Sequence, residues 1–438
     1  MEWILTLSLM FGGLVVLLLA GLPVAFAFIT VNLVGAWVVF GGSMGMIQLV
    51  RNSVSSLTNF TLAPIPLFIL MGAIMFHSGV AQKAINAVDK AIHRVPARLS
   101  VVTIAAGTMF ASLSGSSIAN TGLLGNTMLP EMLRRGYHPT LAMGPIMASG
   151  AIAILIPPSA LAVLLGSLAK ISIAELLVAG IVPALLMVVG FLMVIVLFAK
   201  LRPEMAPSSE VEYLPWRQRF RPLVMDVLPL SLILITVIGT LLAGIATPTE
   251  SAAFGCVAAA VICIFYRAFS FDMIRRAILE TVSLSTVILF IVVASQTFSQ
   301  ILSFSGATQQ TVAWVSGSAV GPTELLIGII LLLLILGCFV DQISMMMLTI
   351  PLVFPIASAA GIDLILLGTV YLLAMEIGLL TPPFGLLLFV MKSAAPPEIR
   401  TTQVYSAVLP FLSVKLIVLA IMVTLPGLIL WLPDMISR

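Results

Sequence analysis

Long uninterrupted runs of apolar residues dominate the hydrophobic pattern of this chain. Because the runs do not alternate between apolar and polar positions, they predict helices rather than the strands of a β-barrel. A helix needs about 20 mostly apolar residues to cross a bilayer. Runs that reach or approach this length are Trp3–Phe40, Thr140–Phe198, Val227–Phe265, Leu325–Phe339 and Lys415–Trp431. The pattern predicts an all-α integral membrane protein with about a dozen membrane segments, some of them short.

Composition also indicates lipid as the solvent of most of the chain. Hydrophobic residues make up 61% of 438 residues and charged residues only 8%, whereas a soluble domain has about 25% charged residues. The net charge is +3, and the basic residues cluster in loops, which indicates membrane topology and no nucleic-acid partner. Glu2 and Trp3 stand where a cleavable signal peptide would be basic, so the first segment is predicted to be retained.

Catalytic motifs are missing from the sequence. It has no Walker motif, no HExxH and no GxSxG, so we expect neither ATP hydrolysis nor hydrolase chemistry from this chain. We predict that the protein is not an enzyme and binds no organic cofactor. Cys256, Cys263 and Cys338 lie in apolar runs at spacings that suit neither a zinc site nor a disulfide framework.

The two halves of the chain resemble each other on either side of a polar segment. Lys200–Asp226 carries nine charged residues and predicts a linker outside the membrane. Landmarks then recur in order: Asn120 with Asp341, Pro130 with Pro351, Gly136 with Gly361, and Pro157–Pro158 with Pro382–Pro383. The first two pairs share one separation in the sequence and the last two share a slightly larger one, so a single short gap aligns them all. Internal repeats of this kind are typical of secondary transporters.

Basic residues predict that the repeats are inverted. The loop Lys83–Arg98 of the first half contains several lysines and arginines, whereas its counterpart Ser305–Thr323 contains none. Cytoplasmic loops carry the excess of these residues. We therefore expect the first loop, the Lys200–Asp226 linker and Arg267–Arg276 in the cytoplasm, and Ser305–Thr323 outside.

Broken helices are the features most informative about function. Proline removes a backbone donor, and a proline doublet leaves carbonyls free at membrane depth. Such backbone is tolerated where it lines a cavity or binds an ion. Unwound carbonyls suit Na⁺, so Ile154–Ser159 and Leu379–Phe384 are candidate sites. The alternative is a simple kink packed against a neighbouring helix.

Two polar sites interrupt other apolar regions. Ser112–Thr121 is rich in hydroxyls and has the composition of a hairpin tip that enters the membrane, although close helix packing is an alternative. Asp341 is an ionisable residue between apolar stretches, with Ser344 one turn away on the same face. Glu250 and Glu376 also lie near apolar runs, and we expect each to be a structural partner of a buried donor.

Several of these segments together resemble a known family over nearly the whole chain. They are Ser114-Gly-Ser-Ser, Asn120, Arg134-Arg-Gly-Tyr137, Ile156-Pro-Pro-Ser159, Asp341 with Pro351, Glu376-Ile-Gly-Leu-Leu-Thr-Pro-Pro-Phe-Gly385, and Leu425-Pro with Trp431-Leu-Pro433. The sequence resembles the large membrane subunit of TRAP (tripartite ATP-independent periplasmic) transporters. It departs from many members, which have an aspartate where this chain has Asn120.

The resemblance implies a multi-pass protein of the bacterial cytoplasmic membrane that uses a Na⁺ gradient. Such a subunit has an elevator architecture, in which a scaffold holds a moving transport domain with two re-entrant helical hairpins. Its partners are a small four-helix membrane subunit, expected here as a separate chain, and a periplasmic substrate-binding protein. Its substrates are small organic acids, either carboxylates or sulfonates. A stand-alone dicarboxylate carrier and a non-transporting membrane scaffold are the alternatives.

The resemblance also assigns residues and boundaries. Candidate Na⁺ ligands are Ser114, Gly115, Asn120, Ala153, Ile156, Pro157, Asp341, Ser344, Gly378, Thr381 and Pro382. Candidate substrate-binding residues are Ser116, Asn120, Ser149, Ser159 and Pro383. The expected parts are scaffold helices at 1–56, a first repeat with hairpin 1 at 57–199, the cytoplasmic linker at 200–226, connecting scaffold helices at 227–282, and a second repeat with hairpin 2 at 283–438.

Overall fold

The predicted all-helical fold is confirmed. The computed structural model describes residues 2–92, 95–207, 215–317 and 320–435, and these ranges contain helices and no strand. The helices of the first half are α1 (Glu2–Leu19), α2 (Val24–Val39), α3 (Ser43–Leu57), α4 (Pro64–His77), α5 (Val80–Ala91), α6 (Arg98–Ser114), α7 (Ser117–Thr127), α8 (Leu129–Arg134), α9 (Pro139–Gly150), α10 (Ala160–Ala169), α11 (Ile173–Ala179) and α12 (Ile181–Leu201).

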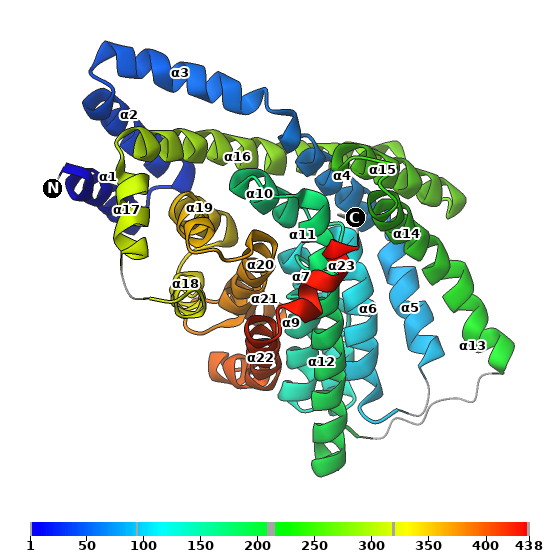
Figure 1. Ribbon diagram of the computed structural model, residues 1–438. Coiled ribbons are helices and arrows are strands. Elements are labelled where there is room, and N and C mark those ends of the chain that lie inside the picture. The colour runs from blue at the N-terminus through cyan, green and yellow to red at the C-terminus, as the bar shows by residue number, and fades with distance from the viewer. Residues whose placement is uncertain (1, 93–94, 208–214, 318–319, 436–438) are drawn as a thin grey trace.

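The helices of the second half complete the bundle shown in Figure 1. They are α13 (Trp216–Pro222), α14 (Leu228–Leu242), α15 (Pro248–Phe265), α16 (Phe271–Phe304), α17 (Ala307–Ser316), α18 (Pro322–Gly337), α19 (Gln342–Ala359), α20 (Leu364–Leu380), α21 (Leu386–Ala394), α22 (Thr401–Thr424) and α23 (Gly427–Asp434). The long α16 runs along one side of the molecule and contacts α2, α3, α4 and α19 (Figure 1). In the interior, α9 packs against both α6 and α22.

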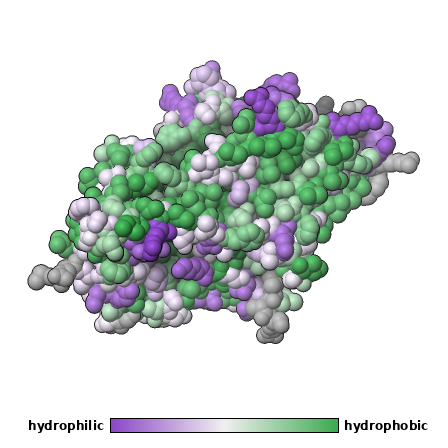
Figure 2. Space-filling model, turned by 90° about the horizontal axis from the view of Figure 1, so that it is seen from above, coloured by the Kyte–Doolittle hydropathy of each residue, from purple (hydrophilic) through white to green (hydrophobic). Residues whose placement is uncertain are grey.

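Many helices present apolar side chains to the outside, as expected of a protein surrounded by lipid. Seven described helical segments are long and apolar enough to cross a membrane: Phe60–His77, Ile173–Leu201, Gln218–Leu242, Pro248–Phe265, Phe271–Phe304, Gln342–Ala359 and Thr401–Thr424. Six further apolar helices of 10–17 residues are shorter. Figure 2 shows apolar residues over much of the visible surface. The chain is therefore a multi-pass membrane protein.

Four helix boundaries of the second half match boundaries of the first at one constant separation. α7 and α19 begin at Ser117 and Gln342, α9 and α20 begin at Pro139 and Leu364, α5 and α17 end at Ala91 and Ser316, and α10 and α21 end at Ala169 and Ala394. The two members of every pair are equally far apart in the sequence. This register needs no gap. It pairs Asp341 with Ser116 and Pro355 with Pro130, whereas the comparison of sequence landmarks pairs Asp341 with Asn120 and Pro351 with Pro130.

All four of the expected boundaries lie inside helices, because the boundary at 56/57 falls within α3, the one at 199/200 within α12 and the one at 226/227 within a π-helical segment. α13 begins at Trp216, within the predicted linker, and continues through a π-helical segment at Leu223–Val227 into α14. The expected boundary between 282 and 283 falls inside α16. Residues 208–214 of the predicted linker lie outside the described residues.

Glycine permits a close backbone contact beside the second proline doublet. A Cβ atom added at Gly337, at the end of α18, would lie 2.9 Å from the Cα atom of Gly378 in α20. Real Cβ atoms are essentially never that close to another heavy atom, and backbone cannot move aside as a flexible side chain can. These two glycines therefore set the distance between the turn that precedes α19 and the end of α20.

We predict that Gly337→Ala lowers the thermal stability of the purified protein. Overpacking of this kind costs about 1–3 kcal/mol. The matched control is Gly328→Ala on the same helix, where an added Cβ has no atom within 4 Å. This control should be neutral or mildly stabilising because alanine favours helix over glycine by about 1 kcal/mol. Thermal unfolding in detergent measures both, and equal melting temperatures would contradict the close contact.

Candidate functional site

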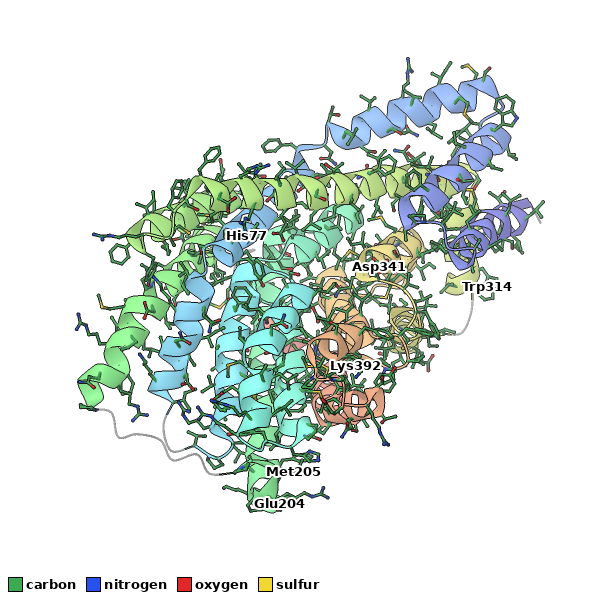
Figure 3. The ribbon with its side chains drawn as sticks, turned by 180° about the vertical axis from the view of Figure 1, so that it is seen from behind. His77, Glu204, Met205, Trp314, Asp341 and Lys392 are labelled. Atoms are coloured by element: carbon green, nitrogen blue, oxygen red, sulfur yellow. The ribbon has the colours of Figure 1, made fainter. Side chains whose placement is uncertain are left out.

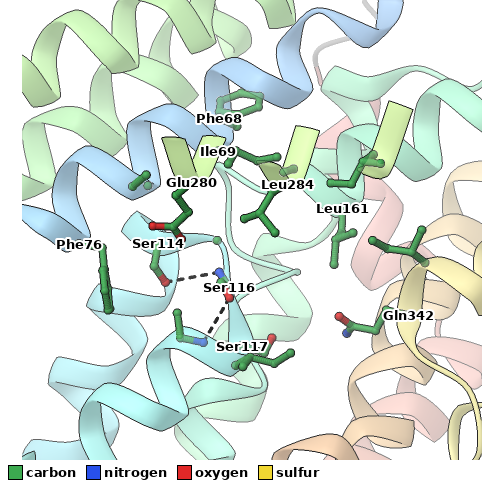
Figure 4. A pocket seen from close by; sticks show the side chains of 18 of the residues that line it. Phe68, Ile69, Phe76, Ser114, Ser116, Ser117, Leu161, Glu280, Leu284 and Gln342 are labelled. Carbon is green, nitrogen blue, oxygen red and sulfur yellow. Dashed lines mark hydrogen bonds between the residues drawn. The ribbon is translucent and has the colours of Figure 1, made fainter. Parts of the chain in front are cut away.

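The first broken element is the turn between α6 and α7. Gly115 ends α6 in the left-handed conformation, with a φ of 60°, which glycine adopts without strain. The Ser114 hydroxyl accepts from the Ser116 backbone N–H at 3.4 Å, and the Ser116 hydroxyl caps α7 by accepting from the Ala119 N–H at 3.2 Å (Figure 4). The hydroxyl-rich sequence therefore satisfies the backbone groups that the turn leaves free.

Each proline doublet interrupts the chain between two helices. Ala151–Pro158 is non-helical between α9 and the Ser159 cap of α10. Thr381–Gly385 separates α20 from α21 in the same way. The Pro157–Pro158 and Pro382–Pro383 peptide bonds are both cis. Each turn lies against the doublet segment of its own half: a Cβ at Gly115 would be 3.5 Å from the Pro158 carbonyl oxygen, and the ring centroids of Phe339 and Phe384 are 5.8 Å apart.

The two turns, the first doublet and the residues that flank the second doublet meet at one pocket of about 280 Å³. The turn Ser114–Ala119, Pro158 and Asp341–Ile343 line it, together with Leu379 and apolar residues of α4 and α16. In Figure 4 the serines of the first turn lie on one side of the pocket and Gln342 on the other. The structure thus brings together four predicted site residues, Ser114, Gly115, Ser116 and Asp341, from opposite halves of the chain.

Four helices begin at this pocket. Its wall includes Ser117 at the start of α7, Ala160 of α10, Gln342 of α19 and Leu386 of α21. The N-terminus of a helix carries a partial positive charge and unpaired N–H groups. A concentration of helix N-termini favours an anionic ligand. The two carboxylates at the wall are Asp341 and Glu280, and Glu280 is paired with His77 at 2.6 Å.

Asn120 lies behind the pocket and is completely buried. Its side-chain amide donates to the carbonyl oxygens of Gly107 at 2.9 Å and Ser149 at 3.2 Å. Among the described residues nothing donates to its Oδ1, nor to the buried hydroxyl oxygen of the adjacent Thr121. Buried oxygens are rarely left unpaired, and oxygen is the ligand that a hard cation prefers.

Asp341 is the N-cap of α19. Its Oδ1 accepts from the backbone N–H groups of Ile343 and Ser344, both at 3.1 Å, and its Oδ2 accepts from the Ser344 hydroxyl. The side chain is exposed, and it lies at the turn that faces the first half (Figure 3). Asp341 and Ser344 are therefore in direct contact, as their spacing predicts, and the carboxylate has a clear structural role in addition to any role in ion binding.

The other predicted residues lie around the pocket rather than at its wall. Ser149 and Ala153 are buried, and the Ser159 hydroxyl is engaged in capping α10. The Gly378 carbonyl accepts from the Thr381 N–H at 3.1 Å, and the Thr381 carbonyl from the Gly385 N–H at 3.1 Å. The Pro383 carbonyl accepts from the Tyr405 hydroxyl at 2.9 Å. Ile156, Pro157 and Pro382 are partly exposed or buried within the two non-helical segments.

Sequence reasoning missed part of this region. Glu376 is expected to be the partner of a buried donor, and it accepts from the Ser117 hydroxyl at 2.8 Å. Its second partner, Lys415, stands in the sequence only as the start of an apolar run. A lone lysine beside Leu416–Ala420 is the signal that could have found it, because an ionisable residue within such a run needs a partner. Glu250, by contrast, is exposed and forms a capping box with Thr247.

Comparison with known proteins identifies the family. Residues 11–428 match the family described as "Tripartite ATP-independent periplasmic transporter, DctM component". The chain is 32% identical to the C4-dicarboxylate TRAP transporter large permease protein DctM of Pseudomonas aeruginosa, covering 86% of this chain and 87% of the relative. It is also 32% identical to the ectoine TRAP transporter large permease protein TeaC of Halomonas elongata, over 98% of this chain and 100% of the relative.

A third relative has the same level of identity and another named substrate. The sialic acid TRAP transporter large permease protein SiaM of Vibrio cholerae is 31% identical, with 96% of each chain covered. Among solved structures, the fold is similar to that of the Alcanivorax borkumensis YdaH transporter, with a TM-score of 0.62 at 15% identity over 87% of this chain and 89% of that one. The homologues are transporter subunits, so the chain is not an enzyme.

We predict that Asp341→Ala and Asp341→Asn differ in stability. Alanine removes the cap of α19 and should cost about 1 kcal/mol, whereas asparagine is as good an N-cap as aspartate. Thermal unfolding of the purified variants should therefore give a lower melting temperature for the alanine variant alone. Equal losses in both variants would mean that the charge, rather than the cap, stabilises this turn.

Proposed function

Because this chain belongs to the large-permease family of TRAP transporters, we propose that it imports a small organic acid, coupled to Na⁺, after delivery by a periplasmic binding protein. The three relatives named above carry the names of C4-dicarboxylate, ectoine and sialic acid transporters at nearly the same identity. Membership of this family therefore does not identify the substrate of this chain. The pocket has to indicate its chemical class.

The observation that carries the proposal is the meeting of four helix N-termini at one pocket. Their partial positive charges and the Ser114–Ser117 hydroxyls would bind a carboxylate or sulfonate group. The volume of about 280 Å³ lies just below the usual range of ligand pockets, which is about 300–1,000 Å³. A compact organic acid therefore fits this pocket better than a large one.

Sodium binding at the broken helices is supported by the separation of helix ends. N-termini face the pocket, whereas the Ala153 and Ile156 carbonyls follow the end of α9, and the Gly378 and Thr381 carbonyls lie in the last turn of α20 and just after it. Carbonyls at unwound helix ends suit Na⁺, while helix N-termini suit an anion. In the first half, the unpaired Asn120 Oδ1 and Thr121 hydroxyl oxygen supply two more oxygens. We assign a second ion to the Asp341 side of the pocket.

Transport would follow from movement of the two turns as one unit. Na⁺ would bind first and hold the Ser114–Ser116 and Asp341 turns in the arrangement that binds the acid. Coupling requires that Na⁺ changes the affinity for substrate. We propose that both turns are re-entrant hairpins of an elevator domain, that the shorter helices complete about a dozen membrane segments, and that the repeats are inverted. The constant register of helix boundaries supports the repeat.

A second cavity supports access from the other side. It measures about 980 Å³ and is lined by hydroxyl and amide side chains of α16, including Ser295, Ser299 and Gln300, and by Lys170. The small pocket lies further toward the N-terminus of α16, at Glu280–Ile288. The two spaces are thus displaced along one helix. We assign the basic segments to the cytoplasm, and place the protein in the bacterial cytoplasmic membrane with a small four-helix subunit.

We predict that proteoliposomes containing this chain and its small membrane subunit take up one member of a labelled organic-acid panel. Uptake should require an inward Na⁺ gradient and the periplasmic binding protein. The measurement repeats each assay with potassium in place of sodium and without the binding protein. Uptake without the binding protein would indicate a stand-alone carrier instead. A folded complex that moves no carboxylate or sulfonate would refute the anion assignment.

We predict that Asn120→Ala raises the sodium concentration for half-maximal uptake at least about tenfold, because a loss of about 1.4 kcal/mol in binding corresponds to a factor of ten. The variant removes the unpaired Oδ1 and two amide hydrogen bonds. Asn52→Ala is the matched control, because Asn52 is a buried asparagine of α3, away from both doublets. An unchanged sodium requirement in a folded Asn120→Ala protein would remove Asn120 from the ion site.

A further inference from the structure

A charged pair lies in the interior of the protein, directly behind the pocket. Glu376 of α20 and Lys415 of α22 are both completely buried, with 3.8 Å between Lys415 Nζ and Glu376 Oε2. Glu376 Oε2 has no hydrogen-bond partner among the described residues. Removing a charge from water is costly unless it is paired. Stability alone therefore does not explain why a charged pair is present in the interior of the protein.

The ammonium group of Lys415 also donates to a broken helix. Its acceptor is the carbonyl oxygen of Ala151, the residue that ends α9 and begins the non-helical segment of the first half. The C-terminus of a helix carries a partial negative charge that favours a cation. Lys415 thus supplies a cation to the same kind of unwound carbonyl that would otherwise bind a free ion.

Glu376 connects this cation to the first turn. Its Oε1 accepts from the Ser117 hydroxyl at 2.8 Å, and Ser117 is the first residue of α7 and part of the pocket wall. A Cβ at Gly150 would overlap the unpaired Thr121 hydroxyl oxygen and lie 3.1 Å from the Ser117 carbonyl oxygen. Ser117, which donates to Glu376, therefore lies one turn of α7 from the unpaired oxygens of Asn120 and Thr121.

The pair has no counterpart in the other half. In the constant register of helix boundaries, Lys415 corresponds to Gly190 and Glu376 corresponds to Ala151 itself. A Cβ at Gly190 would overlap the side chain of Val414, the neighbour of Lys415, so α12 and α22 are in close contact here. Within the described part of the chain, a lysine thus donates to the end of α9, and the corresponding position of the other half is a glycine.

We propose that Lys415 is a built-in cation that neutralises Glu376 and the end of α9, and so positions the first turn without an additional bound ion. This deepens the proposed function, because it states how many free cations the first half needs. Without the ammonium group, the Glu376 carboxylate would need another cation before Ser117 and the turn could take their places. Lys415 is a positioning residue in this account, since it does not line the pocket.

The test compares Lys415→Met, Glu376→Gln and the double variant in the reconstituted complex. Lys415→Met should take up substrate poorly at a sodium concentration that saturates the natural protein, and should recover at higher sodium. Its Hill coefficient for sodium should rise by about one, as one additional ion is bound. Glu376→Gln should not recover, because it leaves an unpaired ammonium. The double variant should show the Hill coefficient of the natural protein.

Lys392→Met is the matched control. Lys392 also donates to a backbone carbonyl, that of Ile399, but has no carboxylate partner among the described ion pairs. It should leave the Hill coefficient unchanged. A Lys415→Met protein with natural sodium dependence would overturn the proposal. The proposal would also be overturned if Lys415→Met lost uptake and neither higher sodium nor the added Glu376→Gln substitution restored it. A pair with a purely structural role would give that result.

Thermal stability separates this inference from the sodium-coupling proposal. NaCl, compared with choline chloride, should raise the melting temperature of Lys415→Met by more than it raises that of the natural protein or the double variant, because a bound ligand stabilises the folded state. If uptake by the natural protein proves independent of sodium, the sodium-coupling proposal is refuted. The comparison of melting temperatures in the two salts still tests the role of Lys415. If Lys415→Met cannot be purified, a double variant that also fails to fold overturns the proposal.

Discussion

The need to satisfy backbone polar groups away from water governs this structure. In a bilayer, unpaired N–H and C=O groups cost several kcal/mol each, so a chain can leave the helical path only where side chains, other backbone or a ligand complete its hydrogen bonds. The turn after α6 meets this requirement with the Ser114 and Ser116 hydroxyls, and the turn before α19 with the Asp341 carboxylate. The pocket exists because these interrupted segments converge.

Helix polarity then separates the two kinds of ligand. Where a helix is broken inside a protein, one piece ends with free carbonyls and the next begins with free N–H groups. Here four helices begin at the pocket, namely α7, α10, α19 and α21. The helices α9 and α20 end nearby, where the non-helical segments start. An anion and a cation are therefore favoured at neighbouring but different places. A transporter that couples the movement of one to the other needs such an arrangement.

Local sequence signals predicted the breaks well and the contacts between distant segments poorly. The Pro157–Pro158 and Pro382–Pro383 doublets were readable because proline acts on its own backbone. Asp341 was ambiguous, since a carboxylate before an apolar run is equally a helix cap or an ion ligand, and the structure shows that it caps α19. The contact of Lys415 with Ala151 joins residues 264 positions apart, and no periodicity within either helix predicts it.

The register of helix boundaries pairs different residues from those that the sequence landmarks pair. Asn120 and Asp341 look alike as residue types, but the helix starts place Asp341 opposite Ser116. At corresponding positions the first half has Ser116, Ala151 and Gly190, and the second half has Asp341, Glu376 and Lys415. All three charges belong to one copy. The two broken helices thus differ in the charge around them, and sites that differ in charge need not bind a ligand with equal affinity.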